Sequence, residues 1–284
     1  MLIGKALSAS SINLYKRAWQ LFKVFTAESS LTWEFPVSEQ TVLLFIAYLY
    51  HKGYAPATIS SMMSALSYIH KLASVPDPTS SYIVRKSMTT AHKLKPANDS
   101  RLPITEDILE QLVKTSRQAF QNVYLSYLYP AMFLLAFHAF LRVREITESD
   151  HTLAFSDVTL TDKSITISFR SAKHSAGKHQ EAVVTAVDNA FICPVQALKQ
   201  YIGKRGCMTG PLFMLKGRSL LRREFVTTLK AMLNIAGIPA GRFNSHSFRI
   251  GAATSSAAKG ASDAQIRKLG RWQSDAFKRY IRLP

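Results

Sequence analysis

The chain has 284 residues, 47% of them hydrophobic, which is enough to build a core in each of two ordinary domains. Its 36 Lys and Arg residues against 18 Asp and Glu give a formal net charge of +18. This excess predicts a polyanionic partner, either nucleic acid or an anionic membrane surface. Two cysteines make no disulfide framework and no Cys/His cluster has zinc-site spacing, so we expect an intracellular protein without a metal.

Two sequence features lead us to expect neither a membrane-spanning nor a secreted protein. The longest apolar run, at residues 42–50, is too short to cross a bilayer. The N-terminal residues lack the apolar stretch and the cleavage site of a signal peptide.

The first ninety-odd residues show helical periodicity alone. Ser38 is a plausible N-cap after Pro36, and Gly53 is a plausible stop for the helix between them. The pattern predicts helices over residues 8–30, 38–53, 58–72 and 82–93.

The segment 94–105 holds two prolines and little apolar content, which is typical of a linker. We therefore predict a helical N-terminal domain over residues 1–95, a linker over 96–104 and a second domain over 105–284.

The second domain is predicted to combine helices with a small sheet. It opens with helices at 106–120 and 124–140, and strands follow at 165–169 and 181–187. The pattern becomes helical again through 218–237 and to the end. We therefore expect a mainly α fold with a small three-stranded β-sheet, of the α+β class.

The available side chains favour phosphodiester chemistry that proceeds without a metal ion. The chain has no paired carboxylates and no glycine-rich phosphate loop, so the parts of a metal-dependent nuclease or a P-loop enzyme are missing. It does contain Arg, Lys, His and Tyr residues in suggestive contexts. Arginine suits the binding of a phosphate because its guanidinium is planar and permanently charged.

Three short motifs carry a family resemblance. HSFR at 246–249, then LGRW at 269–272 and Tyr280, resembles the signature of the tyrosine recombinases, the phage integrase family. Upstream, FHAFLRVREI at 137–146 resembles the first-arginine motif of that family. The helical N-terminal domain is similar to the core-binding domain of the family, so the resemblance covers nearly the whole chain.

The resemblance implies a role for each matching residue. Tyr280 would attack the scissile phosphate, forming a 3′-phosphotyrosyl link and releasing a 5′-hydroxyl. Arg142 and Arg249 would hold the phosphate, with Glu145 supporting Arg142. His246 would assist at the tyrosine hydroxyl.

Two further family positions each have two candidates. The lysine that would protonate the leaving 5′-oxygen is Lys173 or Lys178, and Lys173 fits better. The fourth position usually holds His or Trp directly after the glycine. Spacing from Tyr280 favours Arg271, whereas residue type favours Trp272, whose indole N–H could donate to the phosphate.

The resemblance implies a site-specific recombinase or integrase that works on double-stranded DNA without metal, cofactor or ATP. The amino-acid sequence of segments 193–201, 246–254 and 270–282 is particularly similar to that of recombinases of DIRS and Crypton mobile elements. Such an enzyme would act as a homotetramer on two DNA sites, in the nucleus of a eukaryote or otherwise on DNA in the cytoplasm.

Two alternatives stay open. The same residues could serve a monomeric DNA-relaxing enzyme of the topoisomerase IB type, or a domesticated DNA-binding protein that has lost catalysis. Only four residues follow Tyr280, where many members of the family carry a helix that packs on a neighbouring subunit. We therefore expect either a different mode of assembly or a trimmed natural end.

Overall fold

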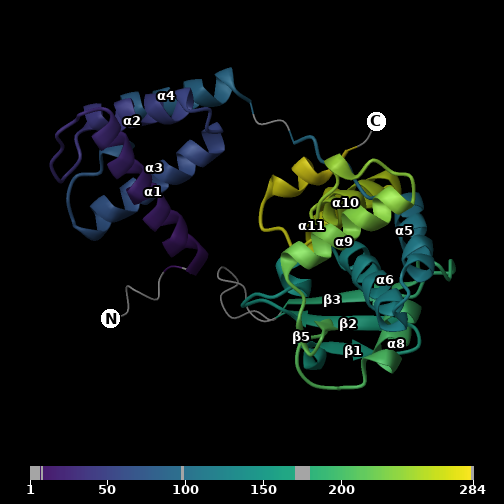
Figure 1. The fold of residues 1–284 in the computed structure, drawn as a ribbon. Helices are drawn as coiled ribbons and strands as arrows, with labels where there is room; N and C mark the ends of the chain where they lie inside the picture. Colours follow the sequence, from purple (N-terminus) through teal and green to yellow (C-terminus); the bar gives the residue numbers. More distant parts are fainter. Residues whose placement is uncertain (1–6, 8, 97–98, 170–179, 283–284) are drawn as a thin grey trace. The chain divides into compact units, whose positions relative to one another are not determined.

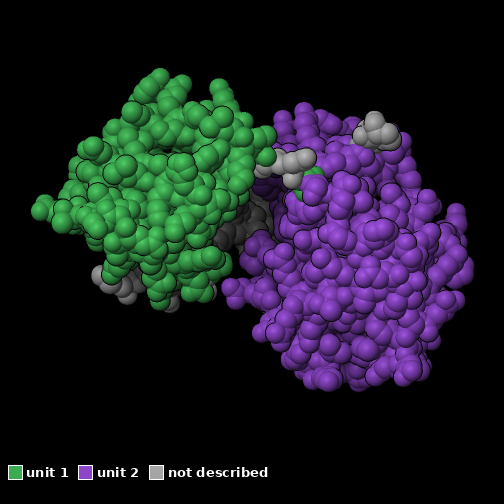
Figure 2. All heavy atoms as spheres, turned by 45° about the horizontal axis from the view of Figure 1, so that its top comes forward, with its two compact units in different colours: residues 1–99 green, residues 100–284 purple. Residues whose placement is uncertain are grey.

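The computed structural model describes residues 7, 9–96, 99–169 and 180–282. The chain divides into two compact units, Met1–Asp99 and Ser100–Pro284 (Figure 2). The division falls inside the segment 96–104, where the sequence predicts a linker.

Unit 1 is helical in the residues described, and the four predicted helices are confirmed (Figure 1). The Ser38 side chain accepts a hydrogen bond from the backbone N–H of Thr41, as an N-cap does. Gly53 has a φ of +84°, which lets the chain leave the second helix. The elements are α1 (Ala9–Glu28), α2 (Glu39–His51), α3 (Pro56–Leu72), the 3₁₀ turn η2 (Pro78–Ser80) and α4 (Tyr82–Leu94).

Aromatic side chains and one buried histidine hold unit 1 together. The rings of Phe22, Phe25 and Phe45 contact one another in its core, with centroids 5.2 to 5.9 Å apart. His70 is fully buried, and its Nε2 accepts a hydrogen bond from the backbone N–H of Val37 at 3.0 Å. Its Nδ1 lies 2.8 Å from the carbonyl oxygen of Leu66. This histidine therefore ties the loop before α2 to α3.

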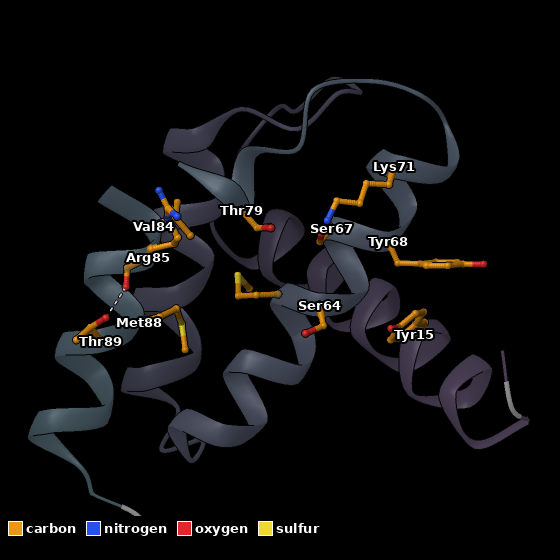
Figure 3. A pocket seen from close by; sticks show the side chains of 11 residues that line it. Tyr15, Ser64, Ser67, Tyr68, Lys71, Thr79, Val84, Arg85, Met88 and Thr89 are labelled. Atoms are coloured by element: carbon orange, nitrogen blue, oxygen red, sulfur yellow. Dashed lines mark hydrogen bonds between the residues drawn. The ribbon is translucent and has the colours of Figure 1, made fainter. Parts of the chain in front are cut away.

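A hollow of about 580 Å³ lies on unit 1 between α1, α3 and α4 (Figure 3). Met63 and Met88 contribute apolar surface to it, and Lys71 and Arg85 contribute positive charge. All of its lining residues belong to unit 1.

Unit 2 has helices and an antiparallel sheet (Figure 1), in agreement with the predicted α+β class. Its sheet has the order β1-β2-β3, and Ile165, Ile167 and Phe169 of β2 face the core. The elements are α5 (Glu106–Ala119), α6 (Val123–His138), α7 (Val143–Ile146), η3 (Phe155–Asp157), β1 (Val158–Leu160), β2 (Ser164–Phe169), β3 (Gln180–Thr185), α8 (Pro194–Arg205), β4 (Met214–Leu215), β5 (Arg218–Ser219), α9 (Arg222–Ile235), η4 (Ala240–Arg242), α10 (Ser247–Ala258), α11 (Asp263–Leu269) and η5 (Asp275–Tyr280).

The helix predicted over 218–237 begins too early. The short strands β4 and β5 pair as a hairpin, and α9 starts only at Arg222. Lys216 and Gly217 both have positive φ, at 52° and 77°, as a tight two-residue hairpin turn requires. This turn overrides the helical periodicity of the residues that follow it.

The helix α6 is the central element of unit 2. Its residues Leu128–Phe137 are all buried, so this stretch is apolar on every side. It contacts α5, α8 and α10. Because α6 is fixed by neighbours all round, the turn at its C-terminal end is held in a defined place, and Arg142 follows that turn.

Gly251 allows α10 to lie directly against the segment that opens unit 2. A Cβ atom at this position would lie only 1.8 Å from the carbonyl oxygen of Ile104. The backbone N–H of Ile104 in turn donates to the carbonyl oxygen of Ser247 at 3.0 Å. This backbone contact therefore requires glycine for steric reasons.

We expect Gly251→Ala to lower the free energy of unfolding by about 1–3 kcal/mol, because backbone must move to admit the methyl group. Urea denaturation followed by circular dichroism measures the change. Gly203→Ala in α8 is the matched control, since a Cβ there meets nothing within 4 Å. In a helix that exchange is favourable by up to about 1 kcal/mol, so equal effects of the two substitutions would refute the steric explanation.

Candidate active site

His246 and Arg249 lie one turn apart at the start of α10. His246 is the N-cap residue, and Arg249 is almost fully buried, with 2% of its surface exposed. Arg249 donates through Nη1 to the carbonyl oxygen of Phe140, and through Nη2 to that of Gly270 at 3.0 Å. These two carbonyls fix the guanidinium between the turn after α6 and the turn after α11.

Arg142 enters the same region as the N-cap residue of α7. Its backbone N–H donates to Glu145 Oε2 at 2.7 Å, and its guanidinium Nη1 lies 3.3 Å from Glu145 Oε1. The Glu145 side chain is 8% exposed, whereas that of Arg142 is 33% exposed. Glu145 therefore binds Arg142 from the buried side, and part of the Arg142 guanidinium stays exposed to solvent.

Arg271 is bound on the other side of the same carboxylate. Its Nη2 donates to Glu145 Oε2 at 2.7 Å, and its Nη1 donates to the carbonyl oxygen of Ala139 at 3.1 Å. Its guanidinium also lies 3.7 Å from the ring centroid of Phe169, which is a cation–π contact. With only 4% of the side chain exposed, Arg271 is part of the buried support of the site.

Trp272 packs against both the buried Arg249 and Tyr280. Its ring is 4.4 Å from the guanidinium carbon of Arg249, and its centroid is 5.1 Å from that of Tyr280. The indole covers Gly270 so closely that a Cβ on Gly270 would lie 1.6 Å from Trp272 Cζ3. Glycine at 270 is therefore a condition for this ring position.

Tyr280 is the last residue of the 3₁₀ helix η5 and is half-buried. Its ring centroid is 5.6 Å from the guanidinium carbon of Arg249 and 6.4 Å from the ring centroid of His246. Phe277, one turn earlier, is fully buried and anchors η5 in the core. The aromatic ring of Tyr280 is thus held beside the arginine and histidine of α10.

Burial shapes the electrostatics of this cluster. Loss of solvent, together with the nearby charges of Arg142 and Arg271, lowers the pKa of Arg249 below its ordinary value. Burial also lowers the pKa of Arg271, and the charge of Glu145 opposes that effect. Guanidinium groups stay protonated in proteins, so three positive charges surround a single carboxylate. A site with this charge balance is suited to an anionic ligand.

The predicted lysines, Lys173 and Lys178, both lie outside the described residues. The strands that flank them pair at Phe169 and Gln180. Phe169 contacts Arg271, so the described end of this strand pair adjoins the site.

One residue of the site was given no role from the sequence. The hydroxyl of Thr254, in the middle of α10, donates to the carbonyl oxygen of Tyr280 and accepts from the backbone N–H of Arg282. A lone Thr in a helix of small residues matches no catalytic pattern, and only the fold brings it to the end of η5.

The other predicted residues come together in unit 2. These residues form one cluster: Arg142, Glu145, His246, Arg249, Arg271, Trp272 and Tyr280.

Among the described residues, no group of three or more His, Cys, Asp or Glu side chains is placed to hold a metal ion. No helix in the described part of the chain has the length and apolar content to cross a membrane.

Comparison with known proteins gives a consistent result. The model of the phage integrase family matches residues 103–283. An integrase/recombinase XerD homolog of Selenomonas ruminantium is 25% identical over 293 residues, which cover 98% of this chain and 83% of that protein.

Solved structures show the same fold at low identity. The XerH site-specific recombinase, in its post-cleavage complex with a palindromic difH substrate, matches with a TM-score of 0.68 at 17% identity, covering 95% of this chain and 75% of that chain. The Tn1549 transposon integrase, in complex with transposon right end DNA, matches with a TM-score of 0.69 at 11% identity, covering 98% and 91%. With the family model matched over most of the sequence, the chain belongs to the phage integrase family.

Proposed function

We propose that this protein cleaves and rejoins double-stranded DNA at specific sites, with Tyr280 as the nucleophile. The observation that carries the proposal is the position of Tyr280. Its ring packs against Trp272, and the ring centroid lies 5.6 Å from the guanidinium carbon of Arg249. A tyrosine in such a cationic cluster is placed to attack a phosphate that the arginines hold.

The chemistry follows from the contacts of each residue. Arg142 and Arg249 neutralise the non-bridging oxygens, on which negative charge builds in the transition state. His246 accepts the proton that the Tyr280 hydroxyl loses while the bond from the tyrosine oxygen to phosphorus forms. The bond from phosphorus to the 5′-oxygen breaks, and Lys173, with Lys178 as the alternative, gives a proton to that oxygen. The phosphotyrosyl bond retains the energy of the broken one, so rejoining needs no ATP.

Trp272 is the better candidate for the fourth family position. Arg271 uses its guanidinium on Glu145, on a backbone carbonyl and on the ring of Phe169. Trp272, by contrast, packs against both Arg249 and Tyr280 and has an indole N–H that can donate to a phosphate oxygen. We therefore assign phosphate contact to Trp272 and a supporting role to Arg271.

The proposed substrate is duplex DNA. The net charge of +18 supports this. Two similar solved structures that contain DNA support it as well: XerH with difH, and a lambda integrase dimer on a COC′ core site. We further propose that four copies act on two sites and exchange strands in pairs. The motif wording supports a place among recombinases of DIRS and Crypton mobile elements.

We expect Tyr280→Phe to abolish covalent attachment to DNA while leaving DNA affinity unchanged, because only the nucleophilic oxygen is removed. The substrate is a mixed library of duplexes, each nicked just downstream of a candidate scissile phosphate. An adduct that survives denaturation is measured by gel electrophoresis. A persisting adduct in the variant would show that another residue is the nucleophile. DNA binding without any adduct in the unaltered chain would favour a catalytically silent binder.

We expect Trp272→Phe and Arg271→Met to separate catalysis from support. Loss of the indole N–H should slow adduct formation by about 10²-fold with little change in thermal stability. Arg271→Met breaks a buried ion pair and should lower the free energy of unfolding by about 3–5 kcal/mol. The reverse pattern, a stable but slow Arg271 variant and a fully active Trp272 variant, would assign the fourth position to Arg271.

We expect DNA binding to weaken steeply with salt, because neutralised phosphates release counterions. With roughly ten phosphates contacted, the dissociation constant should rise about 10³- to 10⁵-fold between about 50 and 200 mM salt. Fluorescence anisotropy of a labelled duplex measures this dependence. A flat salt profile would contradict a binding mode based on phosphate contacts.

A further inference from the structure

Thr254 makes two hydrogen bonds to the chain that carries the candidate nucleophile. Its Oγ1 donates to the carbonyl oxygen of Tyr280 at 3.2 Å, and it accepts from the backbone N–H of Arg282 at 3.0 Å. A threonine hydroxyl has one proton and two lone pairs. The single oxygen of Thr254 therefore serves as donor and acceptor at once.

These bonds occur where the helical pattern of η5 stops. Tyr280 is the last residue of η5, and Ile281 is extended, with φ −87° and ψ 126°. At the end of a helix the last carbonyls have no partner within the helix and need one elsewhere. Thr254 supplies that partner for Tyr280 and also binds the N–H two residues further on. The extended residue Ile281 is thus bracketed by one hydroxyl.

The position of Thr254 links this bracket to the phosphate-binding residues. Thr254 lies on α10, the helix that also carries His246 and Arg249. A helix of this length is a rigid spacer, so the distances between these three positions are fixed. At the other end of η5, Phe277 is fully buried. Tyr280 is therefore held from both sides, by the core through Phe277 and by α10 through Thr254.

We propose that Thr254 is a positioning residue for the cleavage reaction, which sets the backbone of Tyr280 at a fixed distance from Arg249. This inference rests on the proposed function, in which Tyr280 attacks the phosphate. Thr254 contacts neither DNA nor the reacting oxygen in this scheme, and it acts only through the backbone of the nucleophile. Its loss should change the rate of attack, and it should leave phosphate binding intact.

The decisive pair of variants is Thr254→Val and Thr254→Ser. Valine keeps the shape of threonine and removes the hydroxyl, whereas serine keeps the hydroxyl. The rate of adduct formation is measured in a single turnover on the nicked duplex, at saturating protein. We expect Thr254→Val to be slower by up to about 100-fold, since a misplacement of about 1 Å has that effect on a reacting pair. Thr254→Ser should react close to the unaltered rate.

Ser255→Ala is the matched control on the same helix. Ser255 lines a hollow beside β3 that Tyr280 does not line, so its hydroxyl should not affect the rate. The dissociation constant for DNA and the melting temperature are measured for all variants. A lower rate for Thr254→Val alone, at unchanged affinity and melting temperature, supports positioning.

Other results would overturn the inference in distinguishable ways. If the unaltered chain forms an adduct and Thr254→Val matches its rate, the positioning role is wrong and the proposed function stands. The role is equally wrong if serine fails to restore the rate, or if the valine variant loses DNA affinity or melting temperature in parallel with its rate. If the unaltered chain binds DNA and forms no adduct, the proposed function fails and the role of Thr254 fails with it.

Discussion

Three guanidinium groups and one carboxylate lie together in the site. The placement of the surrounding side chains depends on how the positive charge of these arginines is balanced. Glu145 lies between Arg142 and Arg271 and binds both. Arg249 is instead held by the backbone carbonyls of Phe140 and Gly270. Buried charges of one sign are costly unless they are paired. The net positive charge that remains is consistent with a site built for a phosphate.

Two turns with unusual backbone conformation make this balance possible. Phe140 and Arg271 have φ values of 50° and 54°, in the left-handed region that residues other than glycine rarely adopt. The turn at Phe140 directs its carbonyl to Arg249, and the turn at Arg271 directs its side chain to Glu145. Such conformations persist only where the surrounding structure enforces them, and they concentrate at functional sites.

The same turns explain which parts of the fold and of the site could be predicted from the sequence. Helix positions in unit 1 followed from local signals, such as Ser38 at an N-cap, because capping and periodicity act within a few residues. Spacing could not decide between Arg271 and Trp272 for the fourth family position. The directions of these side chains depend on the left-handed turn at Arg271, which no residue type in the sequence predicts. The role of Thr254 could not be predicted for a similar reason: its two hydrogen-bond partners are 26 and 28 residues away in sequence.

The fixed orientation of Arg249 has an energetic consequence. A free arginine side chain has about 2 kcal/mol of rotamer entropy to lose when it is ordered. In this chain the guanidinium is already ordered by the carbonyls of Phe140 and Gly270 and by the ring of Trp272. The ordering therefore occurs during folding, before any ligand arrives. The site is preorganised, so its dipoles need little reorganisation as charge moves onto a phosphate.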